Sequence, residues 1–123
     1  MAPVLRERFW LKHSKRRLVE PFVGGMAVTL SLMPEKALLN DINPHLINFY
    51  LHLRRGLEVK GVKFENSCEI YQVNRERFNL LIQENHADSA EAALLFYYLN
   101  RTGYNGLCRF NQRGFFNVPF RKI

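Results

Sequence analysis

The chain has 123 residues, of which 47% are hydrophobic and 24% are charged, a composition typical of one folded domain rather than a disordered segment. Its formal net charge of +7 favours a polyanionic partner such as nucleic acid, with a merely solvated basic surface as the alternative. The apolar stretches are too short to cross a bilayer and the first residues do not resemble a secretory signal, so we expect a cytoplasmic protein with no membrane partner.

Basic residues and cysteines narrow the possible functions further. Two basic clusters lie near the ends of the chain, one with Arg6, Arg8, Lys12, Lys15, Arg16 and Arg17, the other with Arg101, Arg109, Arg113, Arg121 and Lys122. Such clusters are expected of a surface that binds nucleic acid. The two cysteines, Cys68 and Cys108, lack the spacing of a zinc site, so we expect reduced, packed thiols and no metal.

The first elements predicted along the chain are a strand, a turn, a helix and a second strand. Residues 17–22 form a short apolar run that ends beside a proline, which predicts a buried strand. The following Gly24-Gly25 predicts a tight turn that opens a helix ending at about residue 32. Residues 36–40 are again apolar and predict the second strand.

Another helix is predicted to begin at Asn43-Pro44, which supply an N-cap and a first-turn proline, and to end near Arg55. Its apolar residues recur at helical spacing, at Leu46, Phe49, Tyr50 and Leu53. We expect this stripe to face a sheet. Residues 1–56 are therefore expected to form a partial Rossmann-like α/β unit with the order β-α-β-α.

Residues 57–123 predict a helical segment that ends in a β-hairpin. After a charged loop, Asn66 and Glu69 have the spacing of a capping box that opens one helix, and Asp88 and Glu91 have the spacing of a second. The last apolar segments, residues 107–110 and 115–118, flank a turn-forming Asn-Gln-Arg-Gly and predict the hairpin. The whole chain is thus expected to be an α/β protein that divides after residue 56.

A glycine turn and an acidic residue after the next strand suggest a cofactor site. Gly24 allows the backbone to approach a ligand, and the Asp41 carboxylate can accept hydrogen bonds from ribose hydroxyls. Glu20, at the tip of the first strand, would attract a cationic ligand and repel a pyrophosphate, which favours S-adenosylmethionine over NAD. The alternative is an ordinary turn in which Asp41 only caps the following helix.

Two sequence blocks resemble one enzyme family. Residues 18–28, LVEPFVGGMAV, with LNDIN at 39–43, resemble the cofactor-binding motif of Dam-like DNA adenine methyltransferases. Residues 100–120, NRTGYNGLCRFNQRGFFNVPF, resemble the target-recognition segment of the same family. The resemblance implies an enzyme that transfers a methyl group from S-adenosylmethionine to the N6 amine of an adenine flipped out of double-stranded DNA, within GATC.

The resemblance also implies which residues form the sites. The cofactor pocket would be lined by Glu20, Phe22, Gly24, Gly25 and Asp41. The DNA contacts would come from Arg101, Tyr104, Asn105, Leu107, Arg109, Arg113, Asn117 and Pro119. Among these, Arg109 would read a guanine edge and Tyr104, with Asn105 beside it, would wedge into the base stack. Leu107 and Pro119 would touch thymine methyl groups, and the other two arginines would hold phosphates.

Several of these residues have a structural alternative. Tyr104 and Leu107 would then pack the hairpin against the helices, and Asn105-Gly106 would form only a turn. Asn117 would be a hydrogen-bonding staple between the strands of the hairpin.

The sequence departs from the family in three places. Met26 stands where the family's loop usually has glycine. The catalytic Asp-Pro-Pro-Tyr tetrapeptide is missing, because none of the five prolines adjoins another, so no catalytic residue is assigned. The family's Phe-x-Lys-Trp-x-Gly-Gly-Lys segment is missing too. We therefore expect an internal piece that is inactive alone and needs a chain supplying the missing catalytic half.

Two other functions are compatible with parts of the sequence. A DNA-binding remnant without methyl transfer would keep the basic clusters and the recognition segment. An RNA or small-molecule methyltransferase would share the glycine turn but not the block at residues 100–119. Chromosomal, prophage and restriction-modification enzymes are all possible sources of the motifs.

Overall fold

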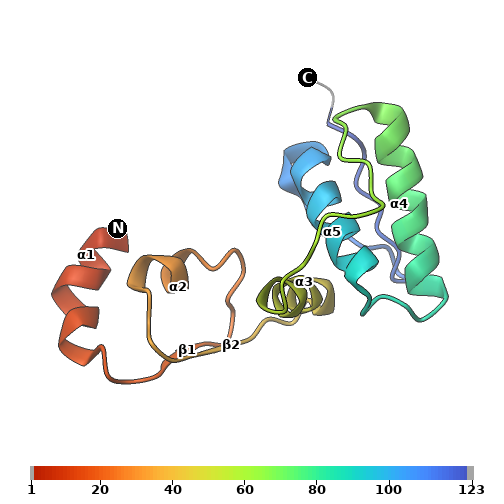
Figure 1. Ribbon diagram of the computed structural model, residues 1–123. Helices are drawn as coiled ribbons and strands as arrows, with labels where there is room; N and C mark the ends of the chain where they lie inside the picture. Colours follow the sequence, from red (N-terminus) through yellow and green to blue (C-terminus); the bar gives the residue numbers. More distant parts are fainter. Residues whose placement is uncertain (1, 122–123) are drawn as a thin grey trace. The chain divides into compact units, whose positions relative to one another are not determined.

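The computed structural model describes residues 2–121 and divides into two compact units, one up to Pro44 and the other from His45 onward (Figure 1). The predicted boundary followed residue 56, so the division observed in the structure assigns the helix after Pro44 to the second unit. Lys122, a member of the second basic cluster, lies outside the described residues.

The first unit begins with three consecutive helical segments. They are α1 (Ala2–Leu5), the π-helical η1 (Arg6–Trp10) and the 3₁₀-helical η2 (Leu11–His13). The helix α2 (Ala27–Leu32) packs against α1. Its Thr29 and Leu32 are buried.

A two-stranded parallel sheet completes the first unit. The strands are β1 (Leu18–Glu20) and β2 (Ala37–Leu39), and α2 lies between them in the sequence, which confirms the predicted β-α-β order. Val19 is in register with Leu38, and these side chains are 56% and 54% exposed. This face of the sheet is therefore largely open to solvent, and the prediction that the first strand is buried is wrong.

The second unit is built from three helices and the segment that follows them. The helices are α3 (Pro44–Arg54), α4 (Cys68–Gln83) and α5 (Ala90–Thr102), and a single 3₁₀ turn, η3 (Tyr104–Gly106), follows α5. The hydrophobic core lies between α4, α5 and the end of the described chain, and its largest fully buried side chains are Tyr71, Phe78, Leu95, Tyr98, Leu99 and Val118. Five consecutive residues of α5, from Ala92 to Phe96, are buried, so this helix is the centre of the unit.

The N-caps of α4 and α5 lie one residue beyond the predicted positions. Ser67 accepts a hydrogen bond from the Ile70 backbone N–H at 3.2 Å, and Ser89 accepts one from the Ala92 N–H at 3.1 Å. The capping boxes predicted at Asn66 and Asp88 are therefore wrong in register. A serine hydroxyl satisfies the same orphan N–H group at a helix start that the predicted side chains would have satisfied.

Three side chains of α4 bind the backbone of the terminal segment. The Tyr71 hydroxyl donates to the Val118 carbonyl at 2.6 Å, and Arg75 donates to the same oxygen at 3.2 Å. Asn79 both donates to the Phe116 carbonyl, at 3.0 Å, and accepts from the Phe116 N–H, at 2.8 Å. Because these α4 residues are four apart, they lie on one face of the helix.

The predicted hairpin is present only as a turn closed by an isolated antiparallel bridge. Phe110 and Phe116 form this bridge, and no strand is assigned to residues 107–121. The turn itself follows the prediction, because the Asn111 N–H donates to the Phe115 carbonyl at 2.8 Å. The Asn117 N–H donates to the Arg109 carbonyl at 3.2 Å, whereas backbone groups of Phe116 and Val118, on the outer edge of the segment, are bound by α4.

Gly103 permits the close approach of α5 to the terminal segment. A Cβ added at this position would lie 2.7 Å from the Leu99 carbonyl oxygen and 3.1 Å from the Tyr71 hydroxyl. The backbone of Gly103 also forms an antiparallel bridge with Phe120. Any larger residue would displace the Tyr71 hydroxyl that holds Val118.

The helix α3 packs on the helical core through part of its apolar stripe. Leu46 and Phe49 contact the core cluster, and Phe49 stacks on Tyr97 of α5 with a centroid separation of 5.4 Å. The Asn48 side chain donates to the carbonyls of Ala87 and Ser89 and so joins α3 to the loop before α5. The stripe therefore serves a helical core, whereas it was predicted to face a sheet.

His45 lies in a cage of three phenylalanine rings. Its ring stacks on Phe110 with a centroid separation of 4.7 Å, lies 6.2 Å from Phe96 and meets the edge of Phe78 at 5.3 Å. Burial lowers the pKa of His45 below its ordinary value of 6.5. The folded state therefore favours the neutral imidazole.

Replacement of His45 by phenylalanine should flatten the dependence of stability on pH. The unfolded state binds the His45 proton at higher pH than the folded state does, so the stability linked to this residue is complete above pH 6.5 and is lost as the pH falls through the folded pKa. Urea unfolding followed by circular dichroism, at a pH above and a pH below 6.5, measures the effect. The exposed His86, changed to glutamine, is the matched control and should keep the wild-type slope. An unchanged slope in His45→Phe would contradict the interpretation.

Candidate functional site

The residues predicted to bind the cofactor lie together where β1 and β2 end. The Asn40 N–H donates to the Glu20 carbonyl at 2.8 Å, and the Val23 N–H donates to the Asn40 carbonyl at 2.8 Å. These bonds join the loop after β1 to the loop after β2. The carboxyl ends of neighbouring parallel strands are the usual place for a ligand in an α/β fold.

Asp41 fixes the two loops to each other. One carboxylate oxygen accepts a hydrogen bond from the Gly24 N–H at 3.1 Å, and the other accepts from the Asn43 N–H at 3.0 Å. The backbone N–H groups of Asn43 and then Gly24 lower the pKa of Asp41, so the side chain is an anion at neutral pH. Each carboxylate oxygen has a second acceptor site, and the side chain can therefore hold these loops and still accept ribose hydroxyls.

Gly24 has a left-handed backbone, with φ at 49°, and an added Cβ would meet no atom within 4 Å. Its surroundings are therefore open, and glycine is favoured here by the backbone conformation and not by crowding. Gly25 likewise has open space at its Cβ position. The turn thus leaves room beside its backbone for a flat or extended ligand.

The other two predicted cofactor residues differ in their surroundings. The Glu20 carboxylate accepts a hydrogen bond from the Thr29 hydroxyl of α2, which orients it at the tip of β1. Phe22 is 85% exposed, so its ring lies free of the core and can stack on a planar ligand. The anion Asp41, the oriented Glu20 and an exposed aromatic ring fit a cationic adenosyl compound.

Met26 and Met33 have left-handed backbone conformations at the two ends of α2. Their φ angles are 61° and 46°, and they serve as the N-cap and C-cap of the helix. An L-residue in this conformation costs about 1–2 kcal/mol, which glycine avoids. Glycine, which Met26 replaces in the sequence motif, would therefore adopt this backbone conformation at lower cost.

The predicted DNA contacts form two groups in the second unit. The Tyr104 N–H donates to the Pro119 carbonyl at 2.9 Å, which joins η3 to the end of the terminal segment. Arg109 and Asn117 form the other group, because Arg109 Nε donates to Asn117 Oδ1 at 2.8 Å and Nη2 donates to the Asn117 carbonyl at 3.3 Å.

The first group presents apolar side chains to solvent. Tyr104 is 50% exposed and Leu107 is 43% exposed, so about half of each side chain is available to a ligand. Asn105, between them, has a left-handed backbone with φ at 51° and forms the tip of η3 with Gly106. Exposed apolar side chains beside a tight turn suit insertion between stacked bases.

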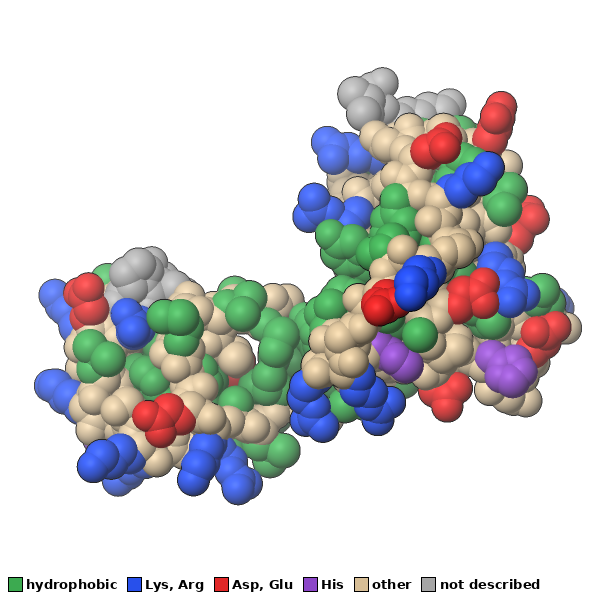
Figure 2. Space-filling view, in the orientation of Figure 1, with side chains coloured by type: hydrophobic (Ala, Val, Ile, Leu, Met, Phe, Trp, Pro, Cys, Tyr) green, Lys and Arg blue, Asp and Glu red, His purple; other side chains and the backbone are tan. Residues whose placement is uncertain are grey.

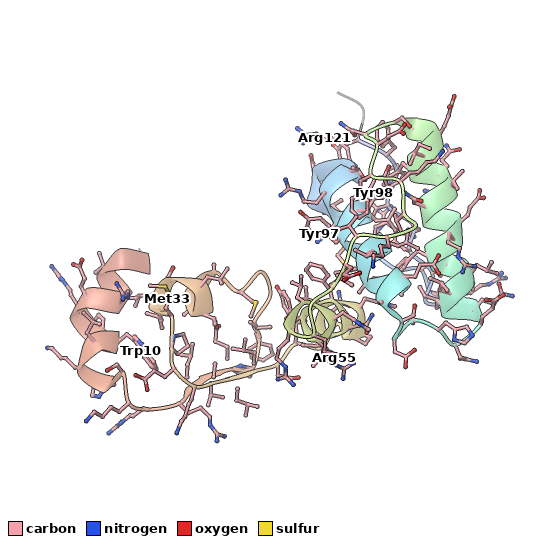
Figure 3. The ribbon with its side chains drawn as sticks, viewed as in Figure 1. Trp10, Met33, Arg55, Tyr97, Tyr98 and Arg121 are labelled. Atoms are coloured by element: carbon pink, nitrogen blue, oxygen red, sulfur yellow. The ribbon has the colours of Figure 1, made fainter. Side chains whose placement is uncertain are left out.

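The basic side chains around these groups are exposed. Arg101, near the end of α5, and Arg113, in the turn after Phe110, both reach solvent, as does Arg121 near the end of the described chain (Figure 3). Figure 2 shows Lys and Arg side chains on the visible surfaces of both units. Pro119 is also exposed. Exposed cations of this kind are available to neutralise the phosphates of a nucleic acid.

Sequence reasoning missed Arg75 and Asn79, which hold the recognition segment in place. Asn79 and Phe116 are 37 positions apart in the sequence, and no local pattern connects them. The sequence did contain one indication. Arg75 and Asn79 follow the buried Tyr71 at a spacing of four and so lie on the same face of α4. A polar residue in line with buried ones indicates a hydrogen-bonding partner on the other side.

The described residues contain no candidate metal cluster, no buried cysteine and no helix able to span a membrane. Within residues 2–121, no group of three or more His, Cys, Asp or Glu side chains lies close enough to hold a metal ion. Both cysteines are exposed, so the prediction that they are packed is wrong. None of the described helices has the length and apolar character needed to cross a lipid bilayer.

The chain belongs to the D12 class of N6 adenine-specific DNA methyltransferases, whose family model matches residues 2–123. Members of this family are enzymes. The chain is 46% identical over 112 residues to the DNA adenine methylase of Vibrio cholerae serotype O1, a match that covers 85% of this chain and 39% of that protein.

Other relatives give the same result. The DNA adenine methylase of Escherichia coli K12 is 44% identical over 110 residues, covering 84% of this chain and 38% of that protein. The DNA adenine methylase of Haemophilus influenzae is 38% identical over 116 residues, covering 88% and 39%. The chain thus spans about 39% of the length of the curated relatives it matches.

Replacement of Met26 by glycine should stabilise the first unit. Glycine removes the left-handed strain but adds freedom to the unfolded chain, and the net gain is expected to be about 0.5–1 kcal/mol. Amide hydrogen exchange of β1 and β2 should slow by roughly two- to fivefold. Met26→Ala keeps a Cβ and should give no gain, whereas Met33→Gly should act as Met26→Gly does. Equal exchange in the glycine and alanine variants would contradict the prediction.

Proposed function

We propose that the chain carries the cofactor loop and the target-recognition segment of a DNA adenine N6-methyltransferase. The reaction is methyl transfer from S-adenosylmethionine to the N6 amine of an adenine flipped out of double-stranded DNA, with GATC as the site. The observation that carries the proposal is the family match over residues 2–123. The arrangement of the two candidate sites supports it.

In this proposal the first unit holds S-adenosylmethionine. Asp41 accepts hydrogen bonds from the ribose hydroxyls, Glu20 attracts the cationic end, and Phe22 packs on an apolar face of the ligand. Gly24 and Gly25 let the backbone approach it. When bound, the cofactor supplies an electrophilic methyl group, and the residues of this chain orient it and exclude water from it.

The second unit reads the DNA. Arg109 contacts a guanine edge, whose O6 and N7 acceptors match the guanidinium fork. Tyr104, with Asn105 beside it, fills the gap left by the flipped adenine, and Leu107 and Pro119 contact thymine methyl groups. Arg101 and Arg113 hold phosphates, which position the protein without reading sequence.

Methyl transfer requires groups that these 123 residues do not contain. The family uses an Asp-Pro-Pro-Tyr tetrapeptide to accept hydrogen bonds from the adenine N6 amine, and no two prolines are adjacent here. We propose that the chain alone is inactive and acts with a polypeptide that carries the tetrapeptide. A second candidate function is DNA binding without methylation. The exposure of Tyr104 and Leu107 favours this function, and DNA binding does not require the missing catalytic half.

The purified chain should bind duplex DNA and leave it unmethylated. A GATC-containing plasmid incubated with the chain and S-adenosylmethionine should stay sensitive to a nuclease blocked by adenine methylation. Addition of a polypeptide with the catalytic half should protect the plasmid, and the DNA-binding alternative predicts that it will not. Protection by the chain alone would contradict the proposed inactivity.

Replacement of Arg109 by alanine should weaken binding to GATC duplex by about 1–3 kcal/mol and reduce discrimination against a duplex with another base at the guanine. Arg113→Ala is the matched control. It should weaken binding to both duplexes equally and lower the salt slope by about one unit. Fluorescence anisotropy over a range of salt concentrations measures both. If Arg109→Ala lost the same affinity for both duplexes, Arg109 would be assigned to a phosphate contact and not to guanine.

Replacement of Asp41 should test the cofactor loop separately. Asp41→Asn keeps one acceptor for the Asn43 N–H but loses the negative charge and one of the two oxygens, so cofactor affinity should fall by roughly tenfold. Asn43→Ala keeps the Asp41 carboxylate and its backbone contacts and should bind nearly as tightly as the wild type. Calorimetric titration with S-adenosylmethionine gives the affinities. Equal affinity for the wild type and Asp41→Asn would remove this residue from the site.

A further inference from the structure

Asn117 binds the guanidinium group of Arg109 from one side only. Arg109 Nε donates to Asn117 Oδ1 at 2.8 Å, and Nη2 donates to the Asn117 carbonyl at 3.3 Å. These two donors form the side edge of the planar guanidinium group. The end of the group, with Nη1 and the second hydrogen of Nη2, forms the other pair of parallel donors.

The backbone that carries Asn117 is held on both sides. Asn79 binds both the N–H and the carbonyl of Phe116, and Tyr71 and Arg75 bind the carbonyl of Val118. The Asn117 N–H also donates to the Arg109 carbonyl at 3.2 Å. The acceptor oxygens that orient Arg109 are therefore anchored to α4, and not to a mobile turn.

A long arginine side chain on an exposed surface normally samples many rotamers, and ordering it on binding costs free energy. At Arg109 most of this ordering has already taken place in the protein without DNA, because two hydrogen bonds fix the plane of the guanidinium group. What remains available is the end pair of donors, whose spacing matches the O6 and N7 acceptors of guanine. The side chain is thus prepared for one kind of bidentate contact.

We propose that Asn117 is a positioning residue that determines base specificity by holding Arg109 in the orientation that reads guanine. This assignment rests on the proposed function of Arg109. It replaces the predicted role of Asn117 as a direct DNA contact with an indirect one. Asn117 binds no base, and its effect on recognition passes through Arg109.

The test compares variants that keep or remove the acceptor at position 117. Asn117→Asp keeps an oxygen acceptor for Arg109 Nε, whereas Asn117→Leu is similar in size and has none. Asn117→Ala is a second variant without the acceptor, in case leucine disturbs folding. The probes are a GATC duplex and the same duplex with 7-deazaguanine at both guanines, which removes the N7 acceptor alone.

The expected result is a loss of discrimination without a loss of folding. The wild type should prefer guanine to 7-deazaguanine by about tenfold. Asn117→Leu and Asn117→Ala should bind both duplexes with nearly equal affinity, as should Arg109→Ala. Asn117→Asp should bind both duplexes more weakly, because its charge repels phosphate. The ratio of its affinities for the two duplexes should stay at the wild-type value.

A readout without DNA separates this proposal from the proposed function. In nitrogen-edited NMR spectra, the Arg109 Nε–H should be protected from exchange in the wild type and in Asn117→Asp, and lost in Asn117→Leu. Full discrimination in Asn117→Leu, with Arg109→Ala impaired, overturns the positioning role and leaves the proposed function intact. A wild type that does not discriminate overturns both, whatever the spectra show.

Discussion

Side-chain hydrogen bonds from α4 to the backbone of residues 116–118 are the interaction on which the second unit depends. The outer edge of this extended segment has no strand partner, and each polar backbone group left buried and unsatisfied there would cost about 1–3 kcal/mol. Tyr71, Arg75 and Asn79 supply the missing partners from one helix face. The segment is therefore as defined as a sheet strand would be, and the exposed side chains on either side of it have a rigid support.

The elements predicted for the first 56 residues agree with the structure because local sequence features determine them. Glycine, proline and short apolar runs marked both strands, α2 and α3, within one or two residues of the observed ends. The N-caps of α4 and α5 were misplaced because two adjacent capping side chains compete at each start, Asn66 with Ser67 and Asp88 with Ser89, and only the backbone geometry decides between them. The α4 side chains that bind residues 116–118 were missed for a different reason, because they lie 37 and 47 positions away in the sequence.

The family of the chain could be predicted from the sequence, but not the hydrogen bonds within the candidate sites. The two blocks that resemble the methyltransferase family contain every residue assigned to the cofactor and to DNA, and the family match agrees with that resemblance. Exposure was beyond prediction, because an apolar residue such as Leu107 is equally compatible with a core and with a surface. So was the left-handed backbone at Met26, which no composition or periodicity reveals.

Burial is uneven between the two units, and this has a consequence for how the chain responds to ligands. The first unit buries few side chains, among them Val23, Thr29 and Leu32, whereas the second has a continuous aromatic core. The candidate cofactor loop lies in the unit with fewer buried side chains, and few buried apolar contacts are typical of regions that open locally at low free energy. A small molecule bound there would suppress fluctuations of residues 18–41 while the melting of the helical core stays almost unchanged, so thermal-shift screens that monitor the core would overlook it.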